Sequence, residues 1–273
     1  MSKLIAIDDG HGMTTAGKRT PIFPPGSEMA GRFMHEDEFN RAVVGYLKTN
    51  LERCGFQTLM VAPGDTDVPL QTRTDAANKA GADFYISVHA NALTGEWGPQ
   101  EGVSTYHYPG SEKGHTAAII IQRQLTQGTK QKDRGVLEAE FFVLKYTKMP
   151  AILCERAFMD NLREATLLLS DAFRRECAEE IAKGTCEYFG MKYVPEAAEK
   201  KLEAKYCIKG GDLPAALLVK GSKNTSSVVK SLQAELNEAG FNCGVVDGIV
   251  GLSWMVSWAQ KHGERCYIST SWK

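Results

Sequence analysis

Two histidines and one glutamate stand where a folded chain could bring them together around a metal ion. His11 closely follows the apolar run Leu4–Ile7, and His89 directly follows the apolar run Phe84–Val88. Both runs indicate buried strands, and in an α/β sheet ligands bind beyond the carboxyl ends of strands. Glu36 begins a helical segment after a long loop. Two histidines and a carboxylate are a typical ligand set of catalytic zinc, whose open fourth position takes water.

Each of these residues also has a structural interpretation when it is taken alone. A histidine at a strand end, such as His11 or His89, is commonly a polar residue with satisfied hydrogen bonds. A glutamate in the first turn of a helix, such as Glu36, is favoured by the helix dipole. The zinc interpretation therefore depends on the convergence of all three side chains.

Glu155 is the fourth residue with a chemical interpretation. It follows the nonpolar segment Pro150–Cys154, so its carboxylate should be partly desolvated. Desolvation raises the pKa of a carboxyl group toward the range that suits acid/base catalysis. Such a group could accept a proton from an attacking water and deliver it to a leaving amine. The structural alternative is a salt bridge with the adjacent Arg156 or another cation.

The segments around these residues alternate between strand and helix patterns. We predict an α/β fold, a twisted and mostly parallel sheet with helices on both faces. The predicted strands span residues 3–8, 56–61, 84–88, 103–108, 141–144 and 150–155, and the predicted helices span residues 37–54, 70–80, 112–125, 161–169 and 171–188. Residues 13–35 and 127–134 are predicted loops, and the length of the first suggests a functional one.

Composition excludes several classes of protein. Hydrophobic residues make up 43% and charged residues 24% of the 273 residues, which is ordinary for a globular protein and excludes a largely disordered chain. The net charge of −1 gives no reason to expect nucleic acid as a partner. No apolar stretch reaches the roughly 18 residues of a membrane span, so we expect no membrane partner. The seven cysteines form no CxxC pair and are expected to be reduced thiols.

Four segments occur in the order of a known family. They are Asp8–Gly12, Glu36–Asn40, Ile86–Ala92 and Pro150–Glu155. On these segments, and over about residues 1–192, the chain resembles the zinc-dependent N-acetylmuramoyl-L-alanine amidases of the amidase-3 type. Those enzymes cut the amide between N-acetylmuramic acid and the L-alanine of the peptidoglycan stem peptide.

The resemblance implies roles for particular residues. It assigns His11, Glu36 and His89 as zinc ligands and Glu155 as the catalytic glutamate. It also implies substrate contacts for Arg19, Asn91 and Arg134; the loop around Arg19 is similar to that of phage and prophage lysins. Two positions depart from the family pattern: Asp9 stands where proline is usual, and Ala157 where glycine is frequent. Neither is a ligand position, so the departures bear on loop geometry.

The C-terminal part of the chain has a different composition. Residues 195–205 are charged and alanine-rich, as expected of a linker after a catalytic domain at residues 1–194. Residues 206–273 are expected to form a small α+β module that binds the cell wall. The segment contains the amphipathic stretch Val228–Glu238 and the residues Trp254, Trp258 and Trp272. A core this small is marginal, so a homo-oligomer formed through this module is also expected.

These observations predict a peptidoglycan hydrolase whose partners are peptidoglycan and wall polymers. The short apolar run after Met1 does not fit a signal peptide, so we expect synthesis in a host cytoplasm and action on the wall after membrane permeabilisation. A phage endolysin fits this setting best, and an autolysin of a mother cell is the nearest alternative. Two other functions stay open: a zinc peptidase acting on the stem peptide, and a non-catalytic wall-binding protein.

Overall fold

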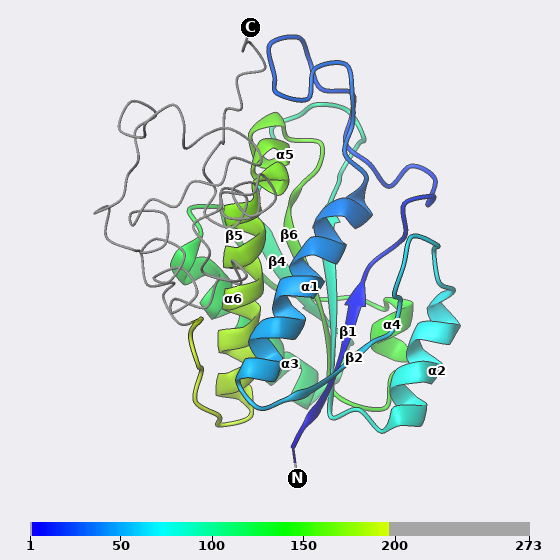
Figure 1. Ribbon diagram of the computed structural model, residues 1–273, viewed down its shortest axis with the longest axis vertical. Coiled ribbons are helices and arrows are strands. Elements are labelled where there is room, and N and C mark those ends of the chain that lie inside the picture. The colour runs from blue at the N-terminus through cyan, green and yellow to red at the C-terminus, as the bar shows by residue number, and fades with distance from the viewer. Residues whose placement is uncertain (1, 197–273) are drawn as a thin grey trace, which may run out of the picture. The chain divides into compact units, whose positions relative to one another are not determined.

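A computed structural model describes residues 2–196 and shows six strands and six helices there (Figure 1). In chain order they are β1 (Leu4–Asp9), α1 (Glu36–Arg53), β2 (Gln57–Met60), α2 (Leu70–Ala80), β3 (Phe84–Asn91), β4 (Val103–His107), α3 (Glu112–Gly128), β5 (Asp133–Glu138), α4 (Phe142–Lys145), β6 (Ala151–Phe158), α5 (Leu162–Leu169) and α6 (Asp171–Tyr188). Within this range no helix has the length and apolar character needed to cross a membrane. The predicted linker beyond residue 196 and the C-terminal module lie outside the described residues.

The strands form one sheet in the order β2-β1-β3-β6-β4-β5. Pairing is parallel from β2 through β1 and β3 to β6 and again between β4 and β5, whereas β4 runs antiparallel to β6. The carboxyl ends of β1, β3 and β6 therefore meet at one end of the sheet. The predicted α/β class with a mostly parallel sheet is confirmed for this part of the chain.

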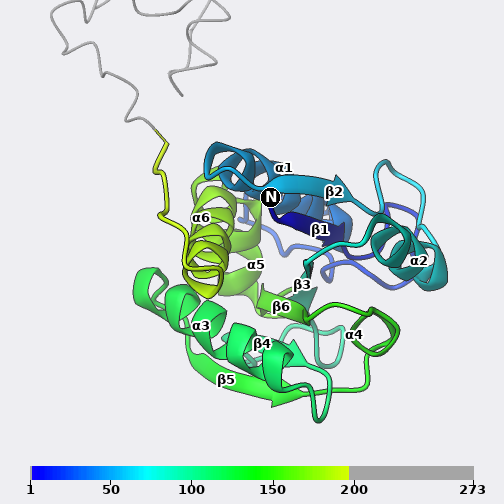
Figure 2. The ribbon, with the colours of Figure 1, turned by 90° about the horizontal axis from the view of Figure 1, so that it is seen from below.

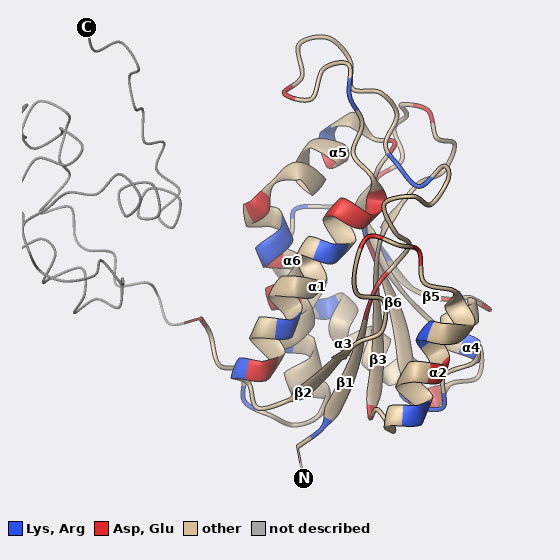
Figure 3. Ribbon diagram, turned by 45° about the vertical axis from the view of Figure 1, so that its right-hand side comes forward, with Lys and Arg blue, Asp and Glu red and all other residues tan. Residues whose placement is uncertain are grey.

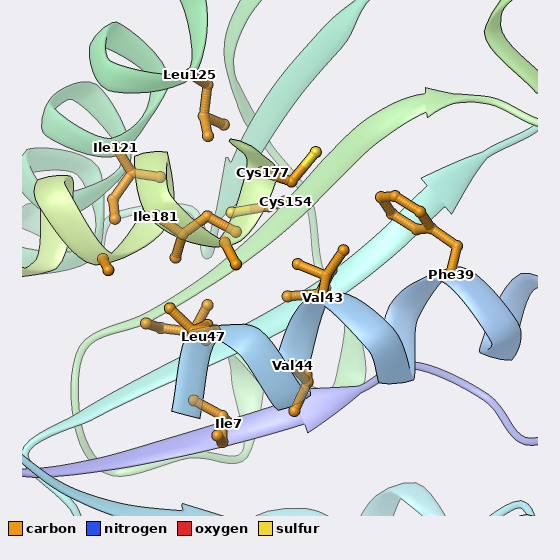
Figure 4. Packing of buried hydrophobic residues seen from close by; sticks show 14 of the residues in the cluster. Ile7, Phe39, Val43, Val44, Leu47, Ile121, Leu125, Cys154, Cys177 and Ile181 are labelled. Atoms are coloured by element: carbon orange, nitrogen blue, oxygen red, sulfur yellow. The ribbon is translucent and has the colours of Figure 1, made fainter. Parts of the chain in front are cut away.

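Helices cover both faces of the sheet (Figure 2). On one face α1, α3, α5 and α6 bury the larger core, in which Phe39, Val43 and Leu47 of α1 recur at helical spacing (Figure 4). On the other face α2 and α4 cover a smaller core that includes Tyr85 of β3 and Leu153 of β6. The four cysteines in residues 2–196 are free and buried, as expected of reduced thiols.

Two local predictions were wrong. The apolar run 141–144 was predicted as a strand, but its residues contribute to the helical turn α4, which buries Val143 and Leu144. A four-residue apolar run has no periodicity that could separate strand from helix. The strand β5 begins inside the predicted loop 127–134. The sequence does not indicate this strand, because its largely exposed residues lack the alternating apolar pattern of a strand.

A buried ion pair ties β6 to α6 and gives a stability prediction. Nη2 of Arg156 lies 2.6 Å from Oε2 of Glu180, with 0% and 6% of the two side chains exposed. Replacing Glu180 with alanine leaves the guanidinium buried and unpaired, so the free energy of unfolding should fall by about 3–5 kcal/mol in urea titrations. The control is Glu179→Ala, which breaks an exposed pair with Lys183 and should cost about 1 kcal/mol or less. Equal losses in the two variants would contradict a structural role for the buried pair.

Candidate functional site

The three predicted ligands lie together at the carboxyl ends of β1 and β3. One donor atom from each of His11, Glu36 and His89 lies within 4.8 Å of the others, and no other such group of three occurs in residues 2–196. His89 Nδ1 is 3.0 Å from Glu36 Oε1, and His11 Nε2 is 3.4 Å from Glu36 Oε2. Glu36 reaches this point because it begins α1, whose acidic first turn lies at this end of the sheet (Figure 3). The arrangement can hold a metal ion.

The carboxylate of Glu36 has one oxygen held by hydrogen bonds and one without a hydrogen bond. Oε1 accepts hydrogen bonds from the backbone N–H of Ala90 at 3.2 Å and from the side-chain amide of Asn40 at 3.3 Å. Oε2 is buried and has no hydrogen-bond partner. A buried oxygen in this state requires an explanation, and a cation at the convergence of the two imidazoles supplies one.

The backbone at His11 is held in an unusual conformation. His11 has φ 69°, and it is the one residue other than glycine with a positive φ among residues 2–196. The buried Arg73 of α2 holds this turn: it pairs with Asp8 and donates to the backbone oxygens of Asp9 at 3.2 Å and His11 at 2.9 Å. Strained backbone persists where the surroundings enforce it, often at functional sites.

Burial and charge prepare these side chains for a cation. Burial lowers the pKa of His11 to about 4, so its imidazole is neutral at neutral pH. Burial also opposes the charge of His89 and Glu36, but the hydrogen bond between them prevails: it raises the pKa of His89 and lowers that of Glu36. His89 would hold a cation as a neutral imidazole, without the proton that it shares with Glu36.

Glu155 lies next to this group in the sheet. It is paired in register with His89, so both side chains project from the same face. Its Oε2 is buried without a hydrogen-bond partner, and burial raises the pKa of its carboxyl group to about 7. Arg156 points to the opposite face and pairs with Glu180, so the salt-bridge alternative for Glu155 with its neighbour does not hold. The group can take up or release a proton near neutral pH.

Two of the three predicted substrate contacts lie beside Phe158, and the third packs on Phe33. Asn91 ends β3 and is in register with Phe158 of β6, and the guanidinium of Arg134 lies 5.1 Å from the centre of the Phe158 ring. Arg19 instead packs on Phe33, with its guanidinium carbon 4.7 Å from the ring centre. Their contacts with a substrate stay predictions.

Sequence reasoning missed one residue beside the centre and one that shapes a loop after β3. Nζ of Lys18 lies 4.0 Å from Glu36 Oε2, and the Lys18 backbone oxygen accepts the N–H of Glu36 at 2.9 Å. Oδ2 of the buried Asp160 accepts three backbone N–H groups, those of residues 93–95, and so shapes the loop that follows Asn91. No spacing pattern marks either residue, because both act through contacts between distant segments.

Gly10 provides a local test of the centre. A Cβ atom at this position would lie 2.0–2.5 Å from three atoms of the His89 imidazole. Gly10→Ala should therefore displace the ring and weaken metal binding, measured as the metal content of the purified protein. The control is Gly45→Ala in α1, where a Cβ meets nothing within 4 Å and metal content should not change. Normal metal content in Gly10→Ala would show that the ring position is not needed.

Comparisons with known proteins place this chain among cell-wall amidases. The amidase-3 family model, described as N-acetylmuramoyl-L-alanine amidase, matches residues 5–187. N-acetylmuramoyl-L-alanine amidase LytC of Bacillus subtilis (strain 168) is 30% identical over 191 residues, which are 69% of this chain but only 36% of LytC. The endolysin of Bacillus phage SPP1 is 32% identical over 213 residues, 75% of this chain and 73% of the endolysin. The crystal structure of an N-acetylmuramoyl-L-alanine amidase from Clostridium difficile 630 matches with a TM-score of 0.62 at 27% identity, covering 69% of this chain and 97% of that one.

Proposed function

The chain belongs to the amidase-3 family of N-acetylmuramoyl-L-alanine amidases, and we propose that it hydrolyses the amide between N-acetylmuramic acid and L-alanine in peptidoglycan. One observation carries this proposal. The family match spans the four residues His11, Glu36, His89 and Glu155, which the fold brings to the same end of the sheet. These residues provide a cation site and an adjacent group for proton transfer.

Zinc is the cation that these donors suit best. Two imidazoles and one carboxylate match the ligands of catalytic zinc sites, and the unpartnered Oε2 of Glu36 is free to coordinate. His11 is already neutral near pH 7, as a ligand must be. When bound, zinc supplies a Lewis acid that polarises a carbonyl and makes a water more acidic.

Glu155 carries the proton through the reaction. Its carboxylate accepts a proton from the water whose oxygen attacks the carbonyl carbon of the lactyl group. As the C–N bond breaks, Glu155 returns that proton to the L-alanine nitrogen, which leaves as an amine. A pKa of about 7 suits both halves of this transfer. The products are a free lactyl carboxyl group and a peptide that begins with L-alanine.

Substrate binding is assigned to the rim of the same end of the sheet. Asn91 is paired in register with Phe158 and Arg134 lies against the Phe158 ring, and a chain of peptidoglycan laid across this rim would contact both. The guanidinium of Arg19 is engaged with Phe33, so its contribution would come through the loop that it stabilises.

A phage endolysin is the biological role that we propose, and the SPP1 endolysin supports it because the match covers most of both chains. The similarity to LytC keeps a bacterial autolysin as the alternative. In the endolysin role the enzyme would reach the wall from the host cytoplasm after membrane permeabilisation, and residues 206–273 would hold it on wall polymers. The family match ends at residue 187 and does not include those residues.

End-group analysis of digested walls tests the proposal. Purified full-length protein is incubated with sedimented bacterial walls, and turbidity, new N-terminal residues, released D-alanine and reducing sugar ends are measured. The amidase should clear the suspension and expose N-terminal L-alanine without new reducing ends. Released D-alanine would instead identify a peptidase, and unchanged turbidity with bound protein would identify a non-catalytic wall-binding protein.

A further inference from the structure

We propose that Ser87 and Asp8 fix the proton of His89 on Nε2, so that Nδ1 is the nitrogen that binds the metal. This inference rests on the proposed metal site, and it gives Ser87 and Asp8 a part in metal binding that the assignments above do not include. The three side chains form a continuous path: His89 Nε2 lies 3.1 Å from Ser87 Oγ, and Ser87 Oγ lies 2.7 Å from Asp8 Oδ2.

The path is positioned by the regular geometry of two neighbouring strands. Residues 85, 87 and 89 alternate along β3, so their side chains share one face of the sheet. Asp8 of β1 is in register with Ser87. Asp8 is 1% exposed and Ser87 is fully buried, so water does not compete for these hydrogen bonds.

The carboxylate of Asp8 accepts hydrogen bonds from three side chains, those of Arg73, Tyr85 and Ser87. Arg73 Nη1 donates to Oδ1 at 2.6 Å, and the Tyr85 hydroxyl donates to Oδ2 at 2.9 Å, the same oxygen that Ser87 contacts. A guanidinium remains protonated in proteins, so its partner here is a carboxylate without a proton. Every hydrogen bond to Asp8 must therefore be donated to it.

The direction of the hydrogen bond between Ser87 and His89 follows from the donors to Asp8. Because Ser87 donates its single hydroxyl hydrogen to Asp8, its oxygen can only accept a hydrogen bond from His89. Nε2 of His89 must then carry a hydrogen. In the neutral imidazole that binds a metal, the lone pair is consequently on Nδ1, and Nδ1 is the atom that lies 3.0 Å from Glu36 Oε1, where the donor atoms converge.

Such outer contacts orient a ligand and fix its tautomer, and their loss typically reduces metal affinity 10- to 100-fold. Ser87→Ala should thus weaken zinc binding by roughly this factor, measured on the full-length protein by competition with a chromophoric chelator. Asp8→Asn is the sharper variant. Its amide would turn its oxygen to Arg73 and its NH₂ group to Ser87, which reverses the path and places the lone pair of His89 on the wrong nitrogen. Its loss of zinc affinity should be at least as large as that of Ser87→Ala.

Tyr85→Phe is the matched control, because it removes a donor from the same Asp8 oxygen and leaves the Ser87 path intact. Its zinc affinity should equal that of the wild type. Thermal unfolding of each variant checks the fold.

A second measurement needs no variant. ¹⁵N NMR of the zinc-loaded wild type should show the proton on Nε2 of His89. Wild-type zinc affinity in Ser87→Ala, or zinc on Nε2, would overturn the inference. If the wild type binds no zinc, both the proposed metal site and this inference fail. That outcome is distinguishable, because the wild type and all variants would then show the same absence of zinc binding.

Discussion

Glu155→Gln should reduce the rate of wall hydrolysis by roughly 100-fold or more, while the purified protein keeps its zinc. Glutamine has nearly the same shape as glutamate but cannot accept the proton of the attacking water at neutral pH. Glu155 is not among the three donors that converge on the cation site, so metal binding should persist. Initial rates of turbidity loss and metal analysis of the same samples measure the two quantities.

A matched control separates this effect from a general loss of charge. Glu138→Gln changes an exposed glutamate at the end of β5 and should leave both rate and zinc content unchanged. Wild-type hydrolysis by Glu155→Gln would remove Glu155 from the reaction. Zinc lost from that variant would instead make Glu155 part of the metal site.

His89→Ala should abolish both zinc retention and hydrolysis. The substitution removes the imidazole that lies 3.0 Å from Glu36 and leaves two donors, His11 and Glu36, for a cation that usually takes three protein ligands in a catalytic site. The expected pattern therefore differs from that of Glu155→Gln, in which the metal stays and the chemistry stops. Zinc content and turbidity measured side by side distinguish the two variants.

The control for this substitution is another histidine. His115 of α3 is hydrogen-bonded to His107 at 2.9 Å and belongs to no group of three metal-binding side chains within residues 2–196. His115→Ala should keep its zinc and its activity. If His89→Ala retained stoichiometric zinc, the ligand set would have to be reassigned.

The centre could be predicted from sequence because its residues stand at the ends of strongly patterned elements. The apolar runs before His11 and His89 specify parallel strands, and parallel strands bring their carboxyl ends together. Glu36 could be placed because it is the first residue of a long amphipathic helix. Residue type and position were enough to predict that these side chains converge, because local pattern and fold agree here. Their role as zinc ligands, which the family resemblance implies, stays a prediction.

The surroundings of the centre could not be predicted in the same way. The path from His89 through Ser87 to Asp8 depends on strand register, and the approach of Lys18 to Glu36 depends on the course of a loop without periodicity. The helical turn α4 was mistaken for a strand because four apolar residues fit either structure. These features are tertiary, and one sequence does not contain a local signal for them.

The products formed from a single defined muropeptide provide the most direct test of zinc-dependent amidase activity. A disaccharide carrying the stem peptide is incubated with the chelator-treated full-length protein, with and without added zinc, and the masses of all products are recorded. The zinc-loaded protein should yield a disaccharide with a free lactyl carboxyl group and an intact peptide that begins with L-alanine, and the metal-free protein should yield neither. Loss of D-alanine from a peptide still joined to the sugar, or the same cleavage without zinc, would contradict the assigned function.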